Sequence, residues 1–127
     1  MPKKILIILI LLSFFSCKKM NEARKVADEF YRYRDELKTD SAAMLCSVFF
    51  WRYTDFKTFE RNILTVQKKY GRMISCKPVY SRYYSSIDSL SDAVVFKYRI
   101  TYEKKIMYDS LALIKDKGTY KILFLFN

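Results

Sequence analysis

The chain of 127 residues contains no histidine, and it has only two glycines and two prolines. Without histidine it cannot build a Ser-His-Asp triad, a Cys-His dyad or a histidine-ligated metal site. The scarcity of glycine excludes a glycine-rich phosphate loop, and the scarcity of proline excludes a proline-rich linker. We therefore expect no cofactor and no metal site.

The chain is nevertheless rich in apolar and basic residues. Aromatic side chains make up 17% of the sequence, which is far more than disordered chains contain. The length suits one domain. Lysine and arginine number 24 against 13 acidic residues, so the formal net charge is +11 and an anionic partner or surface is favoured.

The first 16 residues predict an export signal. Lys3 and Lys4 precede an unbroken apolar run over residues 5–12, which is too short to span a bilayer as a helix. The run leads to Ser16 and Cys17. This order of features resembles the signal and lipobox of bacterial lipoproteins.

The resemblance implies that residues 1–16 are removed and that Cys17 becomes the lipidated first residue. Residues 17–20 are then a lipid-anchored tether, and residues 21–127 form the domain. Lys18 is not the Asp that implies retention at the inner membrane, so we expect the periplasmic side of the outer membrane. A tethered envelope domain rarely meets nucleic acid, and we expect no such partner.

The next part of the chain has helical periodicity. An amphipathic helix is predicted over residues 21–37, a short one over 41–50, and a third from a cap at Thr54 or Asp55 to Tyr70. Gly71 follows where a helix commonly ends.

After Gly71 the apolar period changes to two. Strands are predicted over residues 72–84, 93–103, 106–115 and 119–126, with Pro78 placing the first at an edge or a bulge. Helices followed by an antiparallel meander predict an α+β fold, in which N-terminal helices pack on one face of a curved antiparallel sheet.

Two three-residue loops, 103–105 and 116–118, define a strand register. That register places Leu111, Leu113, Leu123 and Leu125 on the outer face, where they predict an interface for a homodimer or a protein partner. The alternative is that a terminal segment or the third helix covers them. The predicted inner face consists of Phe96, Tyr98, Ile100, Tyr102, Tyr108, Ala112, Ile114, Ile122 and Phe124.

Three segments, residues 27–31, 56–72 and 120–122, resemble the small cystatin-like cone domains of the nuclear transport factor 2-like superfamily. The similarity is closest to the secreted bacterial branch. It implies a cone with a pocket between sheet and helices, and no particular activity.

Small and aromatic residues on the predicted inner face indicate where such a pocket would lie. One alternative is that these aromatic residues form a core without a cavity. For Arg34, the alternative is that it lies at the edge of the apolar face of its helix and extends its guanidinium into solvent. The candidate lining is Tyr31, Arg34, Trp51, Tyr98, Tyr102, Tyr108, Ser110, Ala112 and Phe124.

Asp109 is the only acidic residue at the centre of a strand, and the register turns it outward, opposite Arg99. We expect a cross-strand ion pair there; a slip of one residue would turn Asp109 inward as a general-base candidate. Cys46 and Cys76 form either one disulfide or two buried thiols.

These observations predict a non-enzymatic, lipid-anchored envelope protein that binds a partner protein or a small ligand. One alternative is a dehydratase or isomerase with its site inside the cone. Another is an inhibitor or immunity protein that acts on a secreted toxin or hydrolase.

Overall fold

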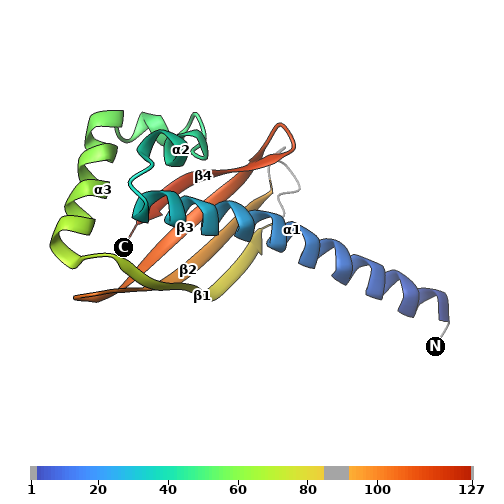
Figure 1. The fold of residues 1–127 in the computed structure, drawn as a ribbon. Coiled ribbons are helices and arrows are strands. Elements are labelled where there is room, and N and C mark those ends of the chain that lie inside the picture. The colour runs from blue at the N-terminus through green and yellow to red at the C-terminus, as the bar shows by residue number, and fades with distance from the viewer. Residues whose placement is uncertain (1–2, 85–91, 127) are drawn as a thin grey trace.

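In a computed structural model, the backbone is described over residues 3–84 and 92–126, and the side chains from residue 18 onward. Helices come first and a four-stranded antiparallel sheet follows, so the predicted α+β fold is confirmed (Figure 1). The elements are α1 (Lys3–Asp35), α2 (Thr39–Met44), the 3-10 turn η1 (Phe50–Arg52), α3 (Phe56–Tyr70), β1 (Met73–Tyr84), β2 (Ala93–Tyr102), β3 (Ile106–Asp116) and β4 (Thr119–Phe126).

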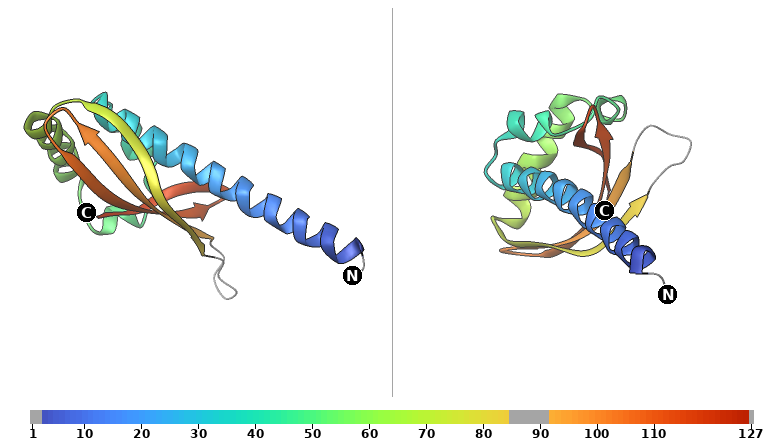
Figure 2. Two further views of the ribbon diagram at one scale, coloured as in Figure 1. Left: turned by 90° about the horizontal axis from the view of Figure 1, so that it is seen from below. Right: turned by 90° about the vertical axis from the view of Figure 1, so that its right-hand side faces the viewer.

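Helix α1 lies across the concave face of the sheet and continues beyond it (Figures 1 and 2). It contains neither glycine nor proline, so nothing interrupts its 33 residues. The fully buried Ala23 and Ala27 let the helix approach the sheet closely, and Phe30 and Tyr31 fill the space beside them. Within the described ranges, no helix is long and apolar enough to cross a membrane.

The third helix agrees with the prediction at both ends. Asp55 caps α3, and its Oδ1 accepts a hydrogen bond from the Thr58 amide at 2.7 Å. Gly71 ends the helix with φ +84°, a conformation in which a glycine has no steric cost.

The predicted helix over residues 41–50 is wrong in extent. It begins at Thr39 and ends at Met44, because the next residues pair with the edge strand β4 instead. The Ser47 amide donates to the Ile122 carbonyl at 2.7 Å, and the Ile122 amide donates to the Leu45 carbonyl at 2.8 Å. These bonds satisfy part of an exposed sheet edge and hold η1 and the start of α3 beside β4.

The sheet is a meander in the order β1-β2-β3-β4, so β1 and β4 are its edges. The register between β1 and β2 shifts between Pro78 and Tyr80. The prediction that Pro78 places the first strand at an edge or a bulge is therefore confirmed.

The predicted register is wrong by one residue between β2 and β3. Between β3 and β4 it is wrong by one residue near the turn and by two residues from Ala112 to Ser110. Tyr102 and Lys105 are hydrogen-bonded, and Asp116 pairs with Thr119, so each loop has two residues and not three. The second turn has positive φ at Lys117 and Gly118, the geometry that suits the twist of a tight hairpin. A further irregularity in the pairing lies between Ala112 and Leu113.

A slip of one residue exchanges the two faces of β3. Tyr98 therefore pairs with Asp109 and not with Ser110, and Asp109 points into the core with 5% of its surface exposed. The expected Arg99–Asp109 pair does not form, since Arg99 pairs with Tyr108. The prediction that Leu111 and Leu113 form an exposed interface is wrong as well, because both residues are fully buried.

Candidate functional site

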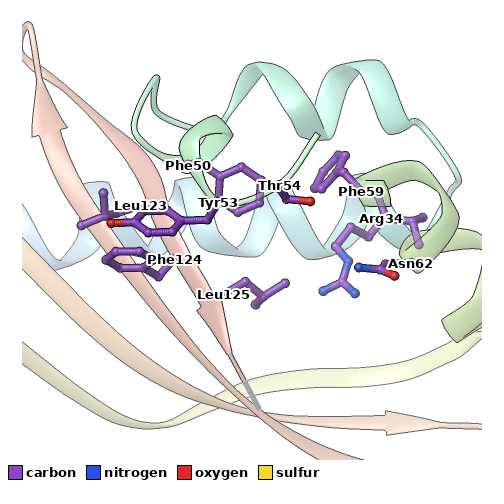
Figure 3. Close-up of a pocket in the computed structure, with 10 residues that line it drawn as sticks. Arg34, Phe50, Tyr53, Thr54, Phe59, Asn62, Leu123, Phe124 and Leu125 are labelled. Atoms are coloured by element: carbon purple, nitrogen blue, oxygen red, sulfur yellow. The ribbon is translucent and has the colours of Figure 1, made fainter. Parts of the chain in front are cut away.

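A half-enclosed pocket of about 210 Å³ lies between the C-terminal half of β4, the η1 turn and α3 (Figure 3). The pairing of Leu45 and Ser47 with Ile122 creates it, because this pairing fixes the chain before η1 against the sheet edge. The lining residues are Arg34, Phe50, Tyr53, Thr54, Phe59, Asn62, Ile63, Leu123, Phe124 and Leu125.

One end of the pocket is polar. Arg34 reaches it from the last turn of α1, and in Figure 3 its guanidinium lies beside the side-chain amide of Asn62 on α3. The neighbouring Asp35 fixes this end of α1, since its Oδ1 accepts from the Met73 amide at 2.8 Å and its Oδ2 pairs with Arg72 at 3.0 Å. Arg34 is thus held at one place relative to the sheet.

The guanidinium of Arg34 has spare hydrogen-bonding capacity. Its side chain is 12% exposed, and its Nη1 lies 3.7 Å from Oδ2 of Asp109, beyond hydrogen-bond distance. Among the described residues, this buried nitrogen has no hydrogen-bond partner. The guanidinium also lies near the rings of Phe30 and Tyr31, 5.6 and 5.7 Å from their centroids. This unpartnered nitrogen is the one nearest Asp109, while the Arg34 side chain also lines the pocket.

Asp109 lies behind Arg34. Burial raises the pKa of the Asp109 carboxyl above its ordinary value, while the Arg34 guanidinium and a 3.4 Å hydrogen bond from the Tyr31 hydroxyl reduce that rise. Burial also raises the pKa of Tyr31 well above its usual range. No carboxylate is among the described residues that line the pocket, so an anion there would meet the Arg34 guanidinium before the Asp109 carboxylate behind it.

The other end of the pocket is aromatic. The rings of Tyr53 and Phe124 pack against each other there, with centroids 5.0 Å apart and planes tilted by 54° (Figure 3). Tyr53 is 72% exposed, so much of its ring faces solvent. Phe50 and Phe59 form an edge-to-face pair at 5.7 Å beneath. An apolar ring or chain would find packing surface on three sides.

Two residues of the predicted lining, Arg34 and Phe124, do line this pocket. Trp51 does not: it is half-buried and packs against Phe50 and Phe59 with centroids 5.0 and 5.3 Å away. Tyr31 and Tyr102 are buried in the core beside Arg34 and border only a void of about 10 Å³.

Three further residues that were predicted to line the pocket lie elsewhere, all for the same reason. Tyr108, Ser110 and Ala112 lie on the outer face because β3 is shifted by one residue, and Tyr108 is 50% exposed. Tyr98 is fully buried, and its hydroxyl donates to Oδ1 of Asp28 at 2.7 Å. The core alternative, in which aromatic hydroxyls are satisfied locally, is therefore correct for Tyr98.

The two cysteines at positions 46 and 76 are free thiols. Cys46 lies beside the edge strand β4, whereas Cys76 belongs to β1 at the opposite edge. Burial raises the pKa of both thiols to about 12, which makes them unreactive near neutral pH. Of the two alternatives left by the sequence, the structure has the free thiols and not the disulfide.

Leu123 and Leu125 face this pocket and not the expected interface. The sequence analysis missed Tyr53, Thr54 and Asn62. The first two lie just before α3, where a helix cap was recognised but a cavity was not. Asn62 carries a clearer signal: it interrupts the apolar face of α3 next to Ile63.

No known family model matches the chain, and a search of curated proteins found no significant match.

Proposed function

We propose that the protein is a lipid-anchored binding protein of the cell envelope that holds a small amphipathic anion in the pocket at Arg34. The observation that carries the proposal is the Arg34 guanidinium in the lining of a pocket that has aromatic residues around it and no carboxylate among its described lining residues. An anionic head such as a carboxylate would bind Arg34 and Asn62, while an apolar body would pack against the contacting rings of Tyr53 and Phe124.

The volume limits the size of the ligand. A cavity of roughly 150 Å³ accepts one benzene ring, so about 210 Å³ has room for one ring with a short carboxylate arm. The pocket is open on one side, and a longer ligand would extend past Tyr53 into solvent.

The geometry favours binding over the enzymatic alternative. A dehydratase or isomerase needs a general base in contact with its substrate. Asp109 does point inward, but Arg34 and Tyr31 stand around its carboxylate and it is not part of the pocket lining. The inhibitor alternative loses its main support, because Leu111 and Leu113 are buried and form no exposed apolar patch.

The anchor remains part of the proposal, and one contact of the domain indicates which part of the sheet it would bring near the membrane. The Lys19 ammonium bonds to Oδ2 of Asp92 at 3.2 Å and to the Tyr83 hydroxyl at 3.1 Å. Lys19 follows Cys17 by two positions, so an acylated Cys17 would hold this end of the sheet close to the bilayer. Residues 17–20, which we expected to be a lipid-anchored tether, belong to α1.

The pocket is tested with phenylacetate and its neutral analogue phenylacetamide as probes, followed by amide NMR shifts. We expect phenylacetate to shift amides of α3 and β4, and phenylacetamide to bind at least about tenfold more weakly because it lacks the charge that pairs with Arg34. Equal binding of the two probes, or no binding of either at about 10 mM, would contradict the proposal.

Two tyrosine variants localise the binding. Tyr53→Ala removes one aromatic wall, and a loss of about 1 kcal/mol of packing would weaken phenylacetate binding about fivefold. Tyr80→Ala is the matched control, because Tyr80 is also an exposed tyrosine but lies on β1, the edge strand opposite β4, and does not line the pocket. An equal effect of both substitutions would place the ligand elsewhere.

A further inference from the structure

Among the described elements, no helix lies over the outer face of the sheet (Figure 2). Its strands carry exposed basic and aromatic side chains. The register places Lys77 opposite Arg99, Arg99 opposite Tyr108, and Tyr80 opposite Lys97. All five are exposed. We call these residues, together with the exposed Arg82 of β1 and Phe126 of β4, the basic outer face.

Acidic residues are absent from this surface within the described strands. Strands β1, β2 and β4 contain none, and β3 contains only the inward-pointing Asp109 and Asp116 at the end of a hairpin. Among the described residues, Lys77, Lys97 and Arg99 form no ion pair with a carboxylate. Their charges are therefore not neutralised by the residues around them.

This arrangement costs stability. Lys77 and Arg99 lie directly opposite each other on neighbouring strands, and like charges in that position destabilise a sheet. With a polar uncharged residue at position 77 or 99, the protein would be at least as stable. An anionic surface of a binding partner would neutralise these two charges and remove the repulsion between them.

The aromatic residues indicate what kind of surface that is. Tyr80 and Tyr108 are 52% and 50% exposed, and the ammonium of Lys97 lies 5.5 Å from the Tyr108 ring. Phe126 is also 52% exposed. Exposed aromatic residues next to cations are typical of protein interfaces, where they form the apolar centre of the contact.

The area and the charge of the basic outer face limit the kinds of partner that it can bind. Four strands about 4.8 Å apart and about ten residues long give a surface of roughly 600 Å². This is close to the roughly 800 Å² that each partner buries in a standard protein interface. A second copy of this chain would bring the same positive charges together, so self-association through this face is disfavoured.

We infer that the basic outer face binds an acidic protein surface that carries exposed apolar side chains. This inference does not rest on the pocket, which opens at the edge of the sheet between β4 and α3.

The inference is tested with two acidic polypeptides as probes, polyglutamate and a random copolymer of glutamate and tyrosine. We expect the copolymer to bind more tightly, because its rings pack on Tyr80 and Tyr108 while its carboxylates meet Lys97 and Arg99. The variant K97E/R99E should bind it about tenfold more weakly or worse. Tyr108→Ala should remove most of the difference between the two probes.

A control variant separates this face from net charge. K57E/R61E changes the same number and kinds of charges on exposed residues of α3, and it should retain most of the binding. An equal loss in both double variants would show that only net charge matters and would overturn the inference. Tighter binding of heparin or a single-stranded oligonucleotide through Lys97 and Arg99 would overturn the partner class.

Stability gives a second readout that does not depend on the probe. Arg99→Glu replaces the like-charged pair with Lys77 by an opposite-charged pair, so its urea midpoint should equal or exceed that of the wild type. A large decrease would show that Arg99 has a structural role and would contradict the argument that this pair is a cost.

Discussion

The guanidinium of Arg34 and the carboxylate of Asp109 face each other inside the concave side of the sheet, with Nη1 and Oδ2 3.7 Å apart. Both side chains are nearly buried, at 12% and 7% exposure. At this distance the two charges attract each other, but the pair does not use up the hydrogen-bonding capacity of the guanidinium. The Arg34 guanidinium therefore stabilises the buried carboxylate of Asp109 and also lines the pocket.

Replacing Arg34 with methionine should destabilise the protein in a pH-dependent way. Removing one partner of a buried pair costs about 3 kcal/mol near neutral pH, because Asp109 stays charged without compensation. The pKa of Asp109 is already raised by burial, and loss of Arg34 raises it further. Folding of the variant then favours the protonated carboxyl, so the deficit relative to the wild type shrinks as the pH falls through that pKa.

Urea unfolding of both proteins near pH 7 and near pH 4 measures this effect. Arg34→Lys is the control, because it keeps a positive charge beside Asp109 and should show a smaller deficit that depends less on pH. A deficit of the Arg34→Met variant that is the same at both pH values would show that packing of the side chain, and not its charge, stabilises the core.

Leu111→Ala should reveal which face of β3 is buried. Leu111 is fully buried, so its truncation should cost about 2 to 5 kcal/mol of unfolding free energy. Tyr108→Ala, on the outer face and half exposed, should cost less than about 1 kcal/mol. Urea midpoints of the two variants give the comparison, and the opposite order would restore the register expected from the sequence.

The sequence was sufficient for the α+β architecture, the edge position of Pro78 and both ends of α3, because these depend on local signals. The register of β3 failed because it depends on loop length. Both hairpin loops were expected to have three residues, but each has two. The two errors shifted β3 in the same sense, so both expected registers still assigned the same residues to each face of β3. Positive φ at the non-glycine Lys117 permits the shorter turn, and the sequence alone does not show it.

The candidate site was predicted only in part for a related reason. Arg34 was found because a charged residue on the apolar stripe of a helix is unusual. Tyr53 and Thr54 were missed because their position depends on the pairing of residues 45–47 with Ile122, a contact between segments far apart in the chain. Helical periodicity favoured a continued helix there, and the tertiary contact with β4 overrode it.

The two glycines should differ in their tolerance of alanine. Both have positive φ, +84° at Gly71 and +83° at Gly118, which is unfavourable for alanine by about 1 kcal/mol. A Cβ at Gly71 would also lie 2.9 Å from Cβ of Glu103, whereas nothing lies within 4 Å at Gly118. Thermal unfolding should show a clearly larger loss for Gly71→Ala. Equal losses would mean that Glu103 moves aside at little cost.

Tyr98→Phe should destabilise the protein by about 1 to 2 kcal/mol, because it removes the 2.7 Å hydrogen bond to the Asp28 carboxylate from a buried ring. Tyr108→Phe is the matched control on the outer face and should leave the unfolding free energy within about 0.5 kcal/mol of the wild type. Denaturant unfolding measures both. If the two substitutions are equivalent, water replaces the tyrosine as the partner of Asp28 at no cost.

Cys17→Ser should abolish incorporation of labelled palmitate when the full chain is expressed in a bacterium. The thiol of Cys17 is the acceptor in the proposed lipid anchor, and serine lacks the sulfur to which a lipoprotein's diacylglyceryl group is attached. Cys46→Ser and Cys76→Ser are the controls: both thiols lie inside the domain with a pKa of about 12, so their loss should leave the label in place. Label that persists in Cys17→Ser, or none in the wild type, would contradict the anchor. The pocket at Arg34 would then have to be interpreted in a protein that is not tethered by lipid.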